Sequence, residues 1–171
     1  MTRHVAPPGT ATPVFADKIA TRATLAQRIA VIPRPMVFTN GVFDILHLGH
    51  ATYLARARAL GASLVVGVNS DPSVRRLGKG GDRPINPLED RIGLVAALES
   101  VSLAVPFDED TPLELVLACR PDIIVKGGDY TADTTVGARE VSSWGGRFES
   151  IPLLAGRSTS GLLRRMRRQG S

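Results

Sequence analysis

The stretch that decides the fold is TNGVFDILHLGH, residues 39–50. It follows a short β-branched and aromatic run and precedes an alanine-rich helical pattern over His50–Leu60. An extended apolar run, a turn and a helical pattern in succession are typical of a β-α unit. The chain contains three histidines, and two of them, His47 and His50, lie at this turn. The turn is therefore the first candidate for a binding site.

The same alternation continues along the chain. Extended apolar runs occur at Met36–Thr39, Ser63–Asn69, Leu103–Phe107, Ile123–Lys126 and Phe148–Pro152. Helical patterns fall at His50–Leu60, Pro87–Leu98, Pro112–Cys119, Val136–Trp144 and from Thr159 to about Arg168. Nearly continuous apolar strands that alternate with helices indicate a parallel sheet covered on both faces. We predict an α/β fold: a single Rossmann-like, doubly wound domain with a five-stranded parallel sheet and helices on both faces.

The ends of this domain are set by composition. Residues 1–16 are rich in Pro and Thr and lack apolar periodicity, which predicts a flexible leader. The domain then spans residues 17–168, with an N-terminal helix at Thr21–Ala30, and a tail covers 169–171. Within it, Asn86 is expected to cap the helix that starts at Pro87. Gly61 and Gly145 are expected to adopt a left-handed backbone after their helices.

The net charge of +5 and the pI of about 10.1 raise the question of nucleic-acid binding. However, the rest of the chain is near neutral once the four arginines close to the C-terminus are set aside. These are Arg164, Arg165, Arg167 and Arg168. This pattern favours the solvated face of a terminal helix and leaves a small phosphate-attracting patch as the alternative. We predict no nucleic-acid partner.

The expected location of the protein in the cell follows from its apolar segments and its cysteine content. No apolar run approaches the roughly 20 residues of a membrane-spanning helix, and the N-terminus has no apolar segment of a secretory signal. The lone cysteine, Cys119, lies in an apolar helical pattern and is expected to pack rather than react. We expect a cytoplasmic protein that does not contact a membrane.

Polar residues gather just after the predicted strands. These segments contain residues 40–50, then Asn69, Ser70 and Asp71 leading to Arg75, Arg76, Lys79 and Arg83, then Lys126, Gly127, Gly128, Asp129 and Tyr130, and finally Gly156, Arg157, Ser158, Thr159 and Ser160. In a parallel sheet the carboxyl ends of the strands meet at one edge, where ligands bind. Glycines, cations and a hydroxyl-rich helix start at this edge indicate a phosphate site. Neither GxGxxG after the first strand nor GxxxxGK[ST] is present, so dinucleotide and kinase-type sites are disfavoured.

The spacing of His47 and His50 places both imidazoles on one face of an opening helical turn. They could bind zinc, but no local third ligand is evident. They could be a structural pair that packs and caps the helix. They could also bind phosphate together with the free N–H groups of the helix, with Gly49 allowing close approach to the backbone.

At this point the sequence resembles a known family. NGVFDILHLGH resembles the HxGH signature of the nucleotidyltransferase superfamily. The segments GVNSDPSVRRL, RPINPLEDR, FDEDTPLELV, PDIIVKGGDY and RSTSGLL are similar to D-glycero-β-D-manno-heptose 1-phosphate adenylyltransferases. The similarity runs from about Lys18 to Arg168. It is nearest to the stand-alone form rather than to the form fused to a sugar kinase. Val42 and Ser160 stand where cysteine and threonine are common.

The resemblance implies transfer of AMP from ATP to heptose 1-phosphate in lipopolysaccharide core synthesis, with Mg²⁺. A sibling enzyme acting on another small phosphate, such as glycerol 3-phosphate with CTP, is the alternative. We also expect a homo-oligomer, a dimer or a tetramer.

The resemblance also assigns roles to residues. The catalytic residues it implies are His47, His50 and Lys126. The nucleotide-binding residues it implies are Asn40, Gly41, Val42, Phe43, Gly49, Gly127, Arg157, Ser158, Thr159 and Ser160. The phosphate or sugar ligands it implies are Asp44, Lys79, Arg83 and Asp129. No protein metal ligand is predicted. Asp44 could instead order its loop, and Asp129 could instead coordinate the metal or shape its turn. Arg91 could pair with Glu89, Asp90 or a carbonyl, or it could contact a ligand.

Overall fold

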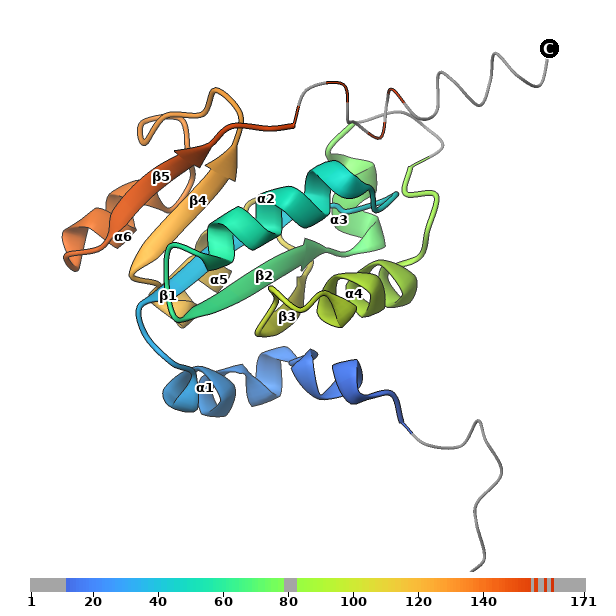
Figure 1. The fold of residues 1–171 in the computed structure, drawn as a ribbon, viewed down its shortest axis with the longest axis horizontal. Helices are drawn as coiled ribbons and strands as arrows, with labels where there is room; N and C mark the ends of the chain where they lie inside the picture. Colours follow the sequence, from blue (N-terminus) through green and yellow to red (C-terminus); the bar gives the residue numbers. More distant parts are fainter. Residues whose placement is uncertain (1–11, 79–82, 155, 157–158, 160, 162–171) are drawn as a thin grey trace, which may run out of the picture.

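A five-stranded parallel sheet forms the centre of the protein (Figure 1). The computed structural model describes residues 12–78, 83–154, 156, 159 and 161. The strands are β1 (Met36–Gly41), β2 (Ser63–Asn69), β3 (Leu103–Phe107), β4 (Ile123–Gly127) and β5 (Arg147–Ile151). Their order is β3-β2-β1-β4-β5, and every pair is parallel. The predicted fold class is confirmed.

Helices cover both faces of the sheet. They are η1 (Val14–Lys18), α1 (Arg22–Val31), α2 (Leu48–Arg58), α3 (Asp71–Arg76), α4 (Leu88–Ala97), α5 (Leu113–Cys119) and α6 (Ala138–Ser143). One apolar cluster joins the sheet to α2 and α4, and a second joins the opposite face to α1, α5 and α6. The two faces are therefore packed independently against different helices.

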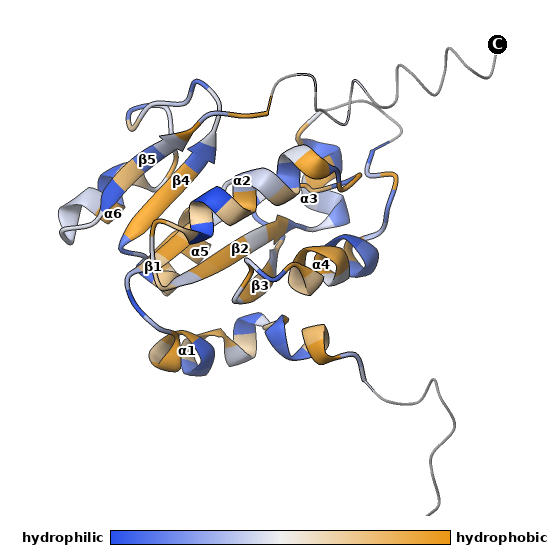
Figure 2. Cartoon of the chain, in the orientation of Figure 1, coloured by the Kyte–Doolittle hydropathy of each residue, from blue (hydrophilic) through white to orange (hydrophobic). Residues whose placement is uncertain are grey.

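The alternation of side chains along the strands explains this division. Val37 faces the α2 side, whereas Met36 and Phe38 face the α1 side, and all three are fully buried. Figure 2 shows the strands as largely apolar, with β4 becoming hydrophilic at its carboxyl end, where Lys126 lies. The apolar pattern thus stops where the binding edge begins.

The order of strands in the sheet changes side between β1 and β4. The strands β2 and β3 lie on one side of β1, and β4 and β5 lie on the other. The ladder between β1 and β4 contains only the pairs Val37↔Ile123 and Phe38↔Ile124, although both strands continue further. Beyond the ladder, the Thr39 hydroxyl donates to the Val125 carbonyl at 3.1 Å and accepts from the Tyr53 hydroxyl at 2.7 Å. This is the switch point at which open parallel sheets bind ligands.

Two local predictions are wrong. The helix α4 is capped by Pro87 without a side-chain hydrogen bond, because the Asn86 side chain donates to the backbone oxygen of Asp44 instead. Gly61 is required for close approach, not for a left-handed backbone: an added Cβ would lie 2.4 Å from the Pro35 carbonyl oxygen. Gly145 does have the predicted left-handed backbone, with φ of 88°.

Other predictions concern the termini. The 3-10 helix η1 spans the expected boundary between leader and domain, and α3 was not predicted. Residues 1–11 of the leader and most of the helix expected from Thr159 onward, including the four C-terminal arginines, lie outside the described residues. Within the described ranges, no helix is both long and apolar enough to cross a membrane.

Candidate active site

The two histidines lie at the beginning of α2. His47 is the N-cap residue with an extended backbone, and its side chain makes no capping hydrogen bond. His50 lies one turn into the helix, and the two rings stack with centroids 3.9 Å apart and planes 18° apart. A helix start that lacks a side-chain cap keeps N–H groups available for an anion. The pair and the helix start therefore form one donor surface.

The environment of His50 keeps its ring neutral. Burial, and secondarily the charge of His47, lowers the pKa of His50 from 6.5 to about 4. Its Nδ1 is buried and has no hydrogen-bond partner among the described residues. Nε2 is therefore the ring nitrogen left to meet a ligand.

Lys126 lies opposite the histidines, at the end of β4. Its ammonium group donates to the side-chain oxygen of Asn40, at the end of β1, and contacts the Asn40 carbonyl at 3.5 Å. The cation is thus held across the point where the β1–β4 ladder has ended. A positive charge in this position can neutralise an anion bound at the switch point.

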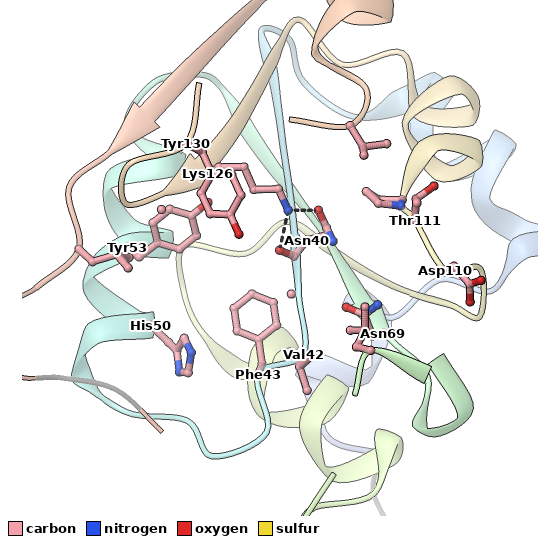
Figure 3. A pocket seen from close by; sticks show the side chains of 16 residues that line it. Asn40, Val42, Phe43, His50, Tyr53, Asn69, Asp110, Thr111, Lys126 and Tyr130 are labelled. Carbon is pink, nitrogen blue, oxygen red and sulfur yellow. Dashed lines mark hydrogen bonds between the residues drawn. The ribbon is translucent and has the colours of Figure 1, made fainter. Parts of the chain in front are cut away.

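His50, Asn40 and Lys126 line a pocket of about 460 Å³ at the carboxyl edge of the sheet (Figure 3), whereas His47 is not part of its lining. In Figure 3 the labelled side chains divide into two groups around the contact between Asn40 and Lys126. His50, Tyr53 and Tyr130 lie on one side. Asn69, Asp110 and Thr111 lie on the other. The pocket therefore has one partly aromatic wall and one polar wall.

A second pocket of about 450 Å³ adjoins the first. Its lining includes Arg83 and Thr159, and it shares Val42, Phe43 and His50 with the first pocket. The Phe43 ring meets His50 edge to face at 5.3 Å. An added Cβ on Gly41 would lie 3.1 Å from that ring, which explains the glycine. Phe43 is thus a wall common to both pockets.

The backbone of Phe43 is strained. Its φ is 49°, in the left-handed region that a bulky side chain rarely adopts. Such a conformation costs on the order of 1–3 kcal/mol and persists only where the surroundings hold it. The residues on both sides of Phe43 are held by buried charged groups.

On the N-terminal side the anchor is Arg91. Its side chain is fully buried and donates to the Val42 carbonyl at 2.7 Å, the Asn86 carbonyl at 2.9 Å and the Asp71 carboxylate at 2.6 Å. Of the alternatives predicted for Arg91, the carbonyl contacts are found, and its acidic partner is Asp71 rather than Glu89 or Asp90.

On the C-terminal side the anchor is Asp44, which is 3% exposed. Its carboxylate accepts from Arg83 at 3.1 Å and from the backbone N–H groups of Ile85 and Asn86 at 2.8 and 3.0 Å. The carboxylate therefore orders the loop before α4, which is one of the two roles predicted for it. The same contacts hold Arg83 at the second pocket.

The structure brings many of the predicted residues together. The first pocket is lined by Asn40, Gly41, Val42, Phe43, His50, Lys126 and Gly127, and the second adds Asp44, Arg83 and Thr159. Gly49 is buried in the first turn of α2. Asp129 is exposed and lines neither pocket. Lys79, Arg157, Ser158 and Ser160 lie outside the described residues.

Several lining residues were not predicted. Tyr53, whose pKa is raised to about 12 by burial, lies one turn after His50 on α2. Asn69 ends β2, in a segment that the sequence placed at this edge without predicting a role for Asn69 itself. Asp110 and Thr111 lie in FDEDTPLELV, one of the segments similar to the family, but no role was predicted for them, and Leu153 lies in none of these segments.

The described residues contain no group of three His, Cys, Asp or Glu side chains that could hold a metal ion. A zinc site on His47 and His50 would thus need a ligand from elsewhere. Burial raises the pKa of the Cys119 thiol to about 12, which suits a packing role.

Comparison with known proteins adds independent findings. The family described as Cytidylyltransferase-like matches residues 38–154. The D-beta-D-heptose 1-phosphate adenylyltransferase of Bordetella bronchiseptica is 57% identical over 155 residues, which cover 90% of this chain and 96% of that protein. The bifunctional protein HldE of Syntrophotalea carbinolica is 50% identical, and the match covers 89% of this chain but only 31% of that protein.

Solved structures give a similar result. The lipopolysaccharide core biosynthesis protein from Thermoplasma volcanium is 34% identical, with a TM-score of 0.58. The match covers 70% of this chain and 95% of that one. A pantoate-beta-alanine ligase from Francisella tularensis has a TM-score of 0.57 at 13% identity, covering 83% of this chain and 68% of that one. The latter likeness concerns the fold alone.

Proposed function

Because the chain belongs to the cytidylyltransferase-like family, we propose that it transfers AMP from ATP to D-glycero-β-D-manno-heptose 1-phosphate, releasing pyrophosphate and ADP-heptose. The identity of 57% to a heptose 1-phosphate adenylyltransferase over nearly the full length of both chains supports the substrates. The observation that carries the chemistry is the position of His50 and Lys126 at one pocket on the switch point of the sheet.

The reaction requires little covalent chemistry from the protein. An oxygen of the sugar phosphate attacks the α-phosphorus of ATP, and the bond from that phosphorus to the bridging oxygen of pyrophosphate breaks. The nucleophile is ionised near pH 7, because the second pKa of a phosphate monoester is about 6. No general base is needed, so the protein has to align the reactants and compensate their charge.

In this proposal the α2 surface binds the triphosphate. The neutral His50 donates from Nε2, and His47 and the first N–H groups of α2 add donors around the same anion. Thr159 and Arg83 at the second pocket, together with Arg157, Ser158 and Ser160, bind the terminal phosphates. Fixed donors of this kind stabilise the charge that develops on departing pyrophosphate without reorganising.

Lys126 is proposed to act where the two substrates meet. Its ammonium lies between the aromatic and polar walls of the first pocket, in contact with Asn40. There it compensates the repulsion between the sugar phosphate and the α-phosphate. The glycines that follow this pair, Gly41 and Gly127, leave room for the side chains of Phe43 and Leu153, which line the same pocket. We propose that Lys79 is a second cation that contacts the acceptor phosphate, and that Asp129 is a ligand of the sugar.

Mg²⁺ is proposed to enter with ATP. The described residues provide no carboxylate cluster, and Mg²⁺ is commonly held by substrate phosphates and water with few protein ligands. The donor set of the site therefore suits an ion carried on the nucleotide, where it would neutralise phosphate charge. We further propose that the enzyme acts in the cytoplasm as a homo-oligomer.

The decisive experiment measures pyrophosphate release with ATP or CTP against a panel of sugar 1-phosphates and glycerol 3-phosphate. We expect turnover with ATP, heptose 1-phosphate and Mg²⁺, and loss of turnover in excess EDTA. A preference for CTP with glycerol 3-phosphate would replace the proposed substrates with those of a sibling enzyme. Undiminished turnover in EDTA would contradict the role of Mg²⁺.

A further inference from the structure

Asn69 is the polar side chain of the polar wall that is almost completely buried while it lines the pocket. It is the last residue of β2 and is 4% exposed. Its amide nitrogen donates to the hydroxyl of Ser73 at 3.0 Å, and Ser73 is itself fully buried in α3. A buried side-chain amide whose nitrogen is already hydrogen-bonded has little freedom to rotate.

The contact with Ser73 determines which end of the amide faces the pocket. The Ser73 hydroxyl donates to the backbone carbonyl of Glu109 at 3.1 Å, and a carbonyl can only accept. The single hydroxyl proton of Ser73 is therefore used, so the atom of Asn69 that faces Ser73 has to be the donor nitrogen. The oxygen is the end left for the pocket, and Figure 3 shows it turned toward the middle.

The surroundings of this oxygen suit a polyol. Asp110 and Thr111 line the same wall, whereas Tyr53 and Tyr130 lie near His50. Leu153 lies beside Tyr53, because both side chains would meet a Cβ added at Gly127. An adenine ring is bound well by aromatic and apolar side chains, and a sugar needs several hydrogen-bonding groups. The polar wall is thus the better match for the acceptor, which leaves the aromatic wall for the base.

The polar wall is also built firmly. Arg76 of α3 donates to the carboxylate of Asp110 at 2.6 Å and to the backbone oxygen of Asp108. Ser70, the N-cap of α3, donates to the Asp108 carboxylate. The loop after β3 is therefore in contact with α3, the helix that contains Ser73.

We propose that the side-chain oxygen of Asn69 accepts a hydrogen bond from a hydroxyl of the acceptor sugar, and that Ser73 is the positioning residue that fixes this polarity. The proposal rests on the proposed function, since it assigns a wall of the same pocket to the acceptor. A site built to accept from a hydroxyl discriminates against analogues that lack it, because the buried oxygen is then left unpaired.

The test uses steady-state kinetics of the full chain with both substrates varied. In Asn69→Ala we expect the KM for the sugar 1-phosphate to rise about 10-fold to 100-fold, in line with the loss of one buried hydrogen bond and its pairing, with the KM for ATP within about twofold. Ser73→Ala should shift the same KM in the same direction by less. Ser63→Ala is the matched control and should leave the KM unchanged, because it removes a fully buried hydroxyl that donates to the Pro33 carbonyl at the opposite end of β2, outside both pockets.

A series of sugar 1-phosphates that each lack one hydroxyl distinguishes a direct contact from a merely structural role, because a structural role would not change the preference for a particular hydroxyl. Removal of the hydroxyl that Asn69 binds should raise the KM of the unaltered enzyme for the sugar 1-phosphate. The same removal should leave the KM of Asn69→Ala unchanged. If Asn69→Ala fails to fold, Ser73→Ala carries the test, since it frees the amide and should weaken the preference for the hydroxyl.

The outcomes separate this inference from the proposed function. An unaltered enzyme that turns over heptose 1-phosphate, combined with an unchanged sugar KM in Asn69→Ala, overturns the inference alone. A rise in the KM for ATP instead would assign Asn69 to the nucleotide and overturn it as well. Absence of turnover with every sugar 1-phosphate would overturn both.

Discussion

Lys126 at the end of β4 donates from its ammonium group to the side-chain oxygen of Asn40 at the end of β1. The two strands are neighbours in the sheet, but their ladder has already ended at Phe38 and Ile124. Beyond the last backbone pair, β1 and β4 are thus joined by a side-chain hydrogen bond, and this bond holds the Lys126 ammonium group at the pocket.

We predict that Lys126→Met lowers kcat by at least about 10²-fold, because a preorganised charge at the reacting phosphates is lost. Asn40→Ala should have a smaller effect, and the double variant should be little worse than Lys126→Met, since the two residues act together. Steady-state kinetics with ATP and the sugar phosphate provide the measurement. Lys18→Met is the control, because Lys18 donates to the Leu98 carbonyl outside both pockets. Additive losses would show that Asn40 does not act through Lys126.

We predict that His47→Ala and His50→Ala each lower kcat by about 10²-fold to 10³-fold, as expected for loss of a donor to developing phosphate charge. Their melting temperatures should remain near that of the parent, and no variant should contain stoichiometric zinc. His4→Ala is a matched control, as His4 is the remaining histidine of the chain. Activity within about threefold of the parent in either variant would remove that histidine from the phosphate site.

The pKa of His50 predicts a pH dependence of stability. Its value of about 4 in the folded state lies below the ordinary 6.5, so the unfolded chain takes up this proton at higher pH. The contribution to stability is therefore present above about pH 6.5 and is lost as the pH falls toward about 4. Urea midpoints measured across this window should fall less steeply in His50→Gln than in the parent. Parallel curves would contradict the shift.

Binding of phosphate should reverse this shift. An anion against the ring favours the charged imidazolium, so we predict that ATP or pyrophosphate binding near pH 5.5 is accompanied by proton uptake. Calorimetry in two buffers with different ionisation enthalpies measures the number of protons directly. The uptake should disappear in His50→Gln. An uptake that is unchanged in this variant would assign the proton to another group.

We predict that Arg91→Met lowers the free energy of unfolding by about 3–5 kcal/mol, because Asp71 and two carbonyls would lose their buried partner. Asp71→Asn, which keeps an oxygen acceptor, should cost less. Denaturant unfolding measures both. The variants that fold should also lose kcat, because the Val42 carbonyl next to the strained Phe43 is released. A stable Arg91→Met with full activity would show that this anchor is not needed.

The sequence predicted the sheet well because strand signals are local. Extended apolar runs and the helices between them placed all five strands at or within a residue or two of their observed bounds. The histidines and Lys126 were also predicted at the correct edge, since parallel strands end together.

The remaining features depend on contacts between distant segments. Glu89 and Asp90 precede Arg91 directly, yet its partner is Asp71, because the buried guanidinium reaches the start of α3. The left-handed backbone of Phe43 carries no sequence signal, since only its surroundings impose it. The polarity of Asn69 depends in the same way on a hydroxyl and a carbonyl from two other segments.

The early end of the β1–β4 ladder has a consequence for self-association. Unpaired peptide groups are usually found on the outer strand of a sheet, where another chain can add and begin to aggregate. Here the gap lies in the interior of the sheet, flanked by β2 and β5, so no further strand can enter it. At this gap, main-chain groups can therefore face a small ligand without forming a template for another polypeptide.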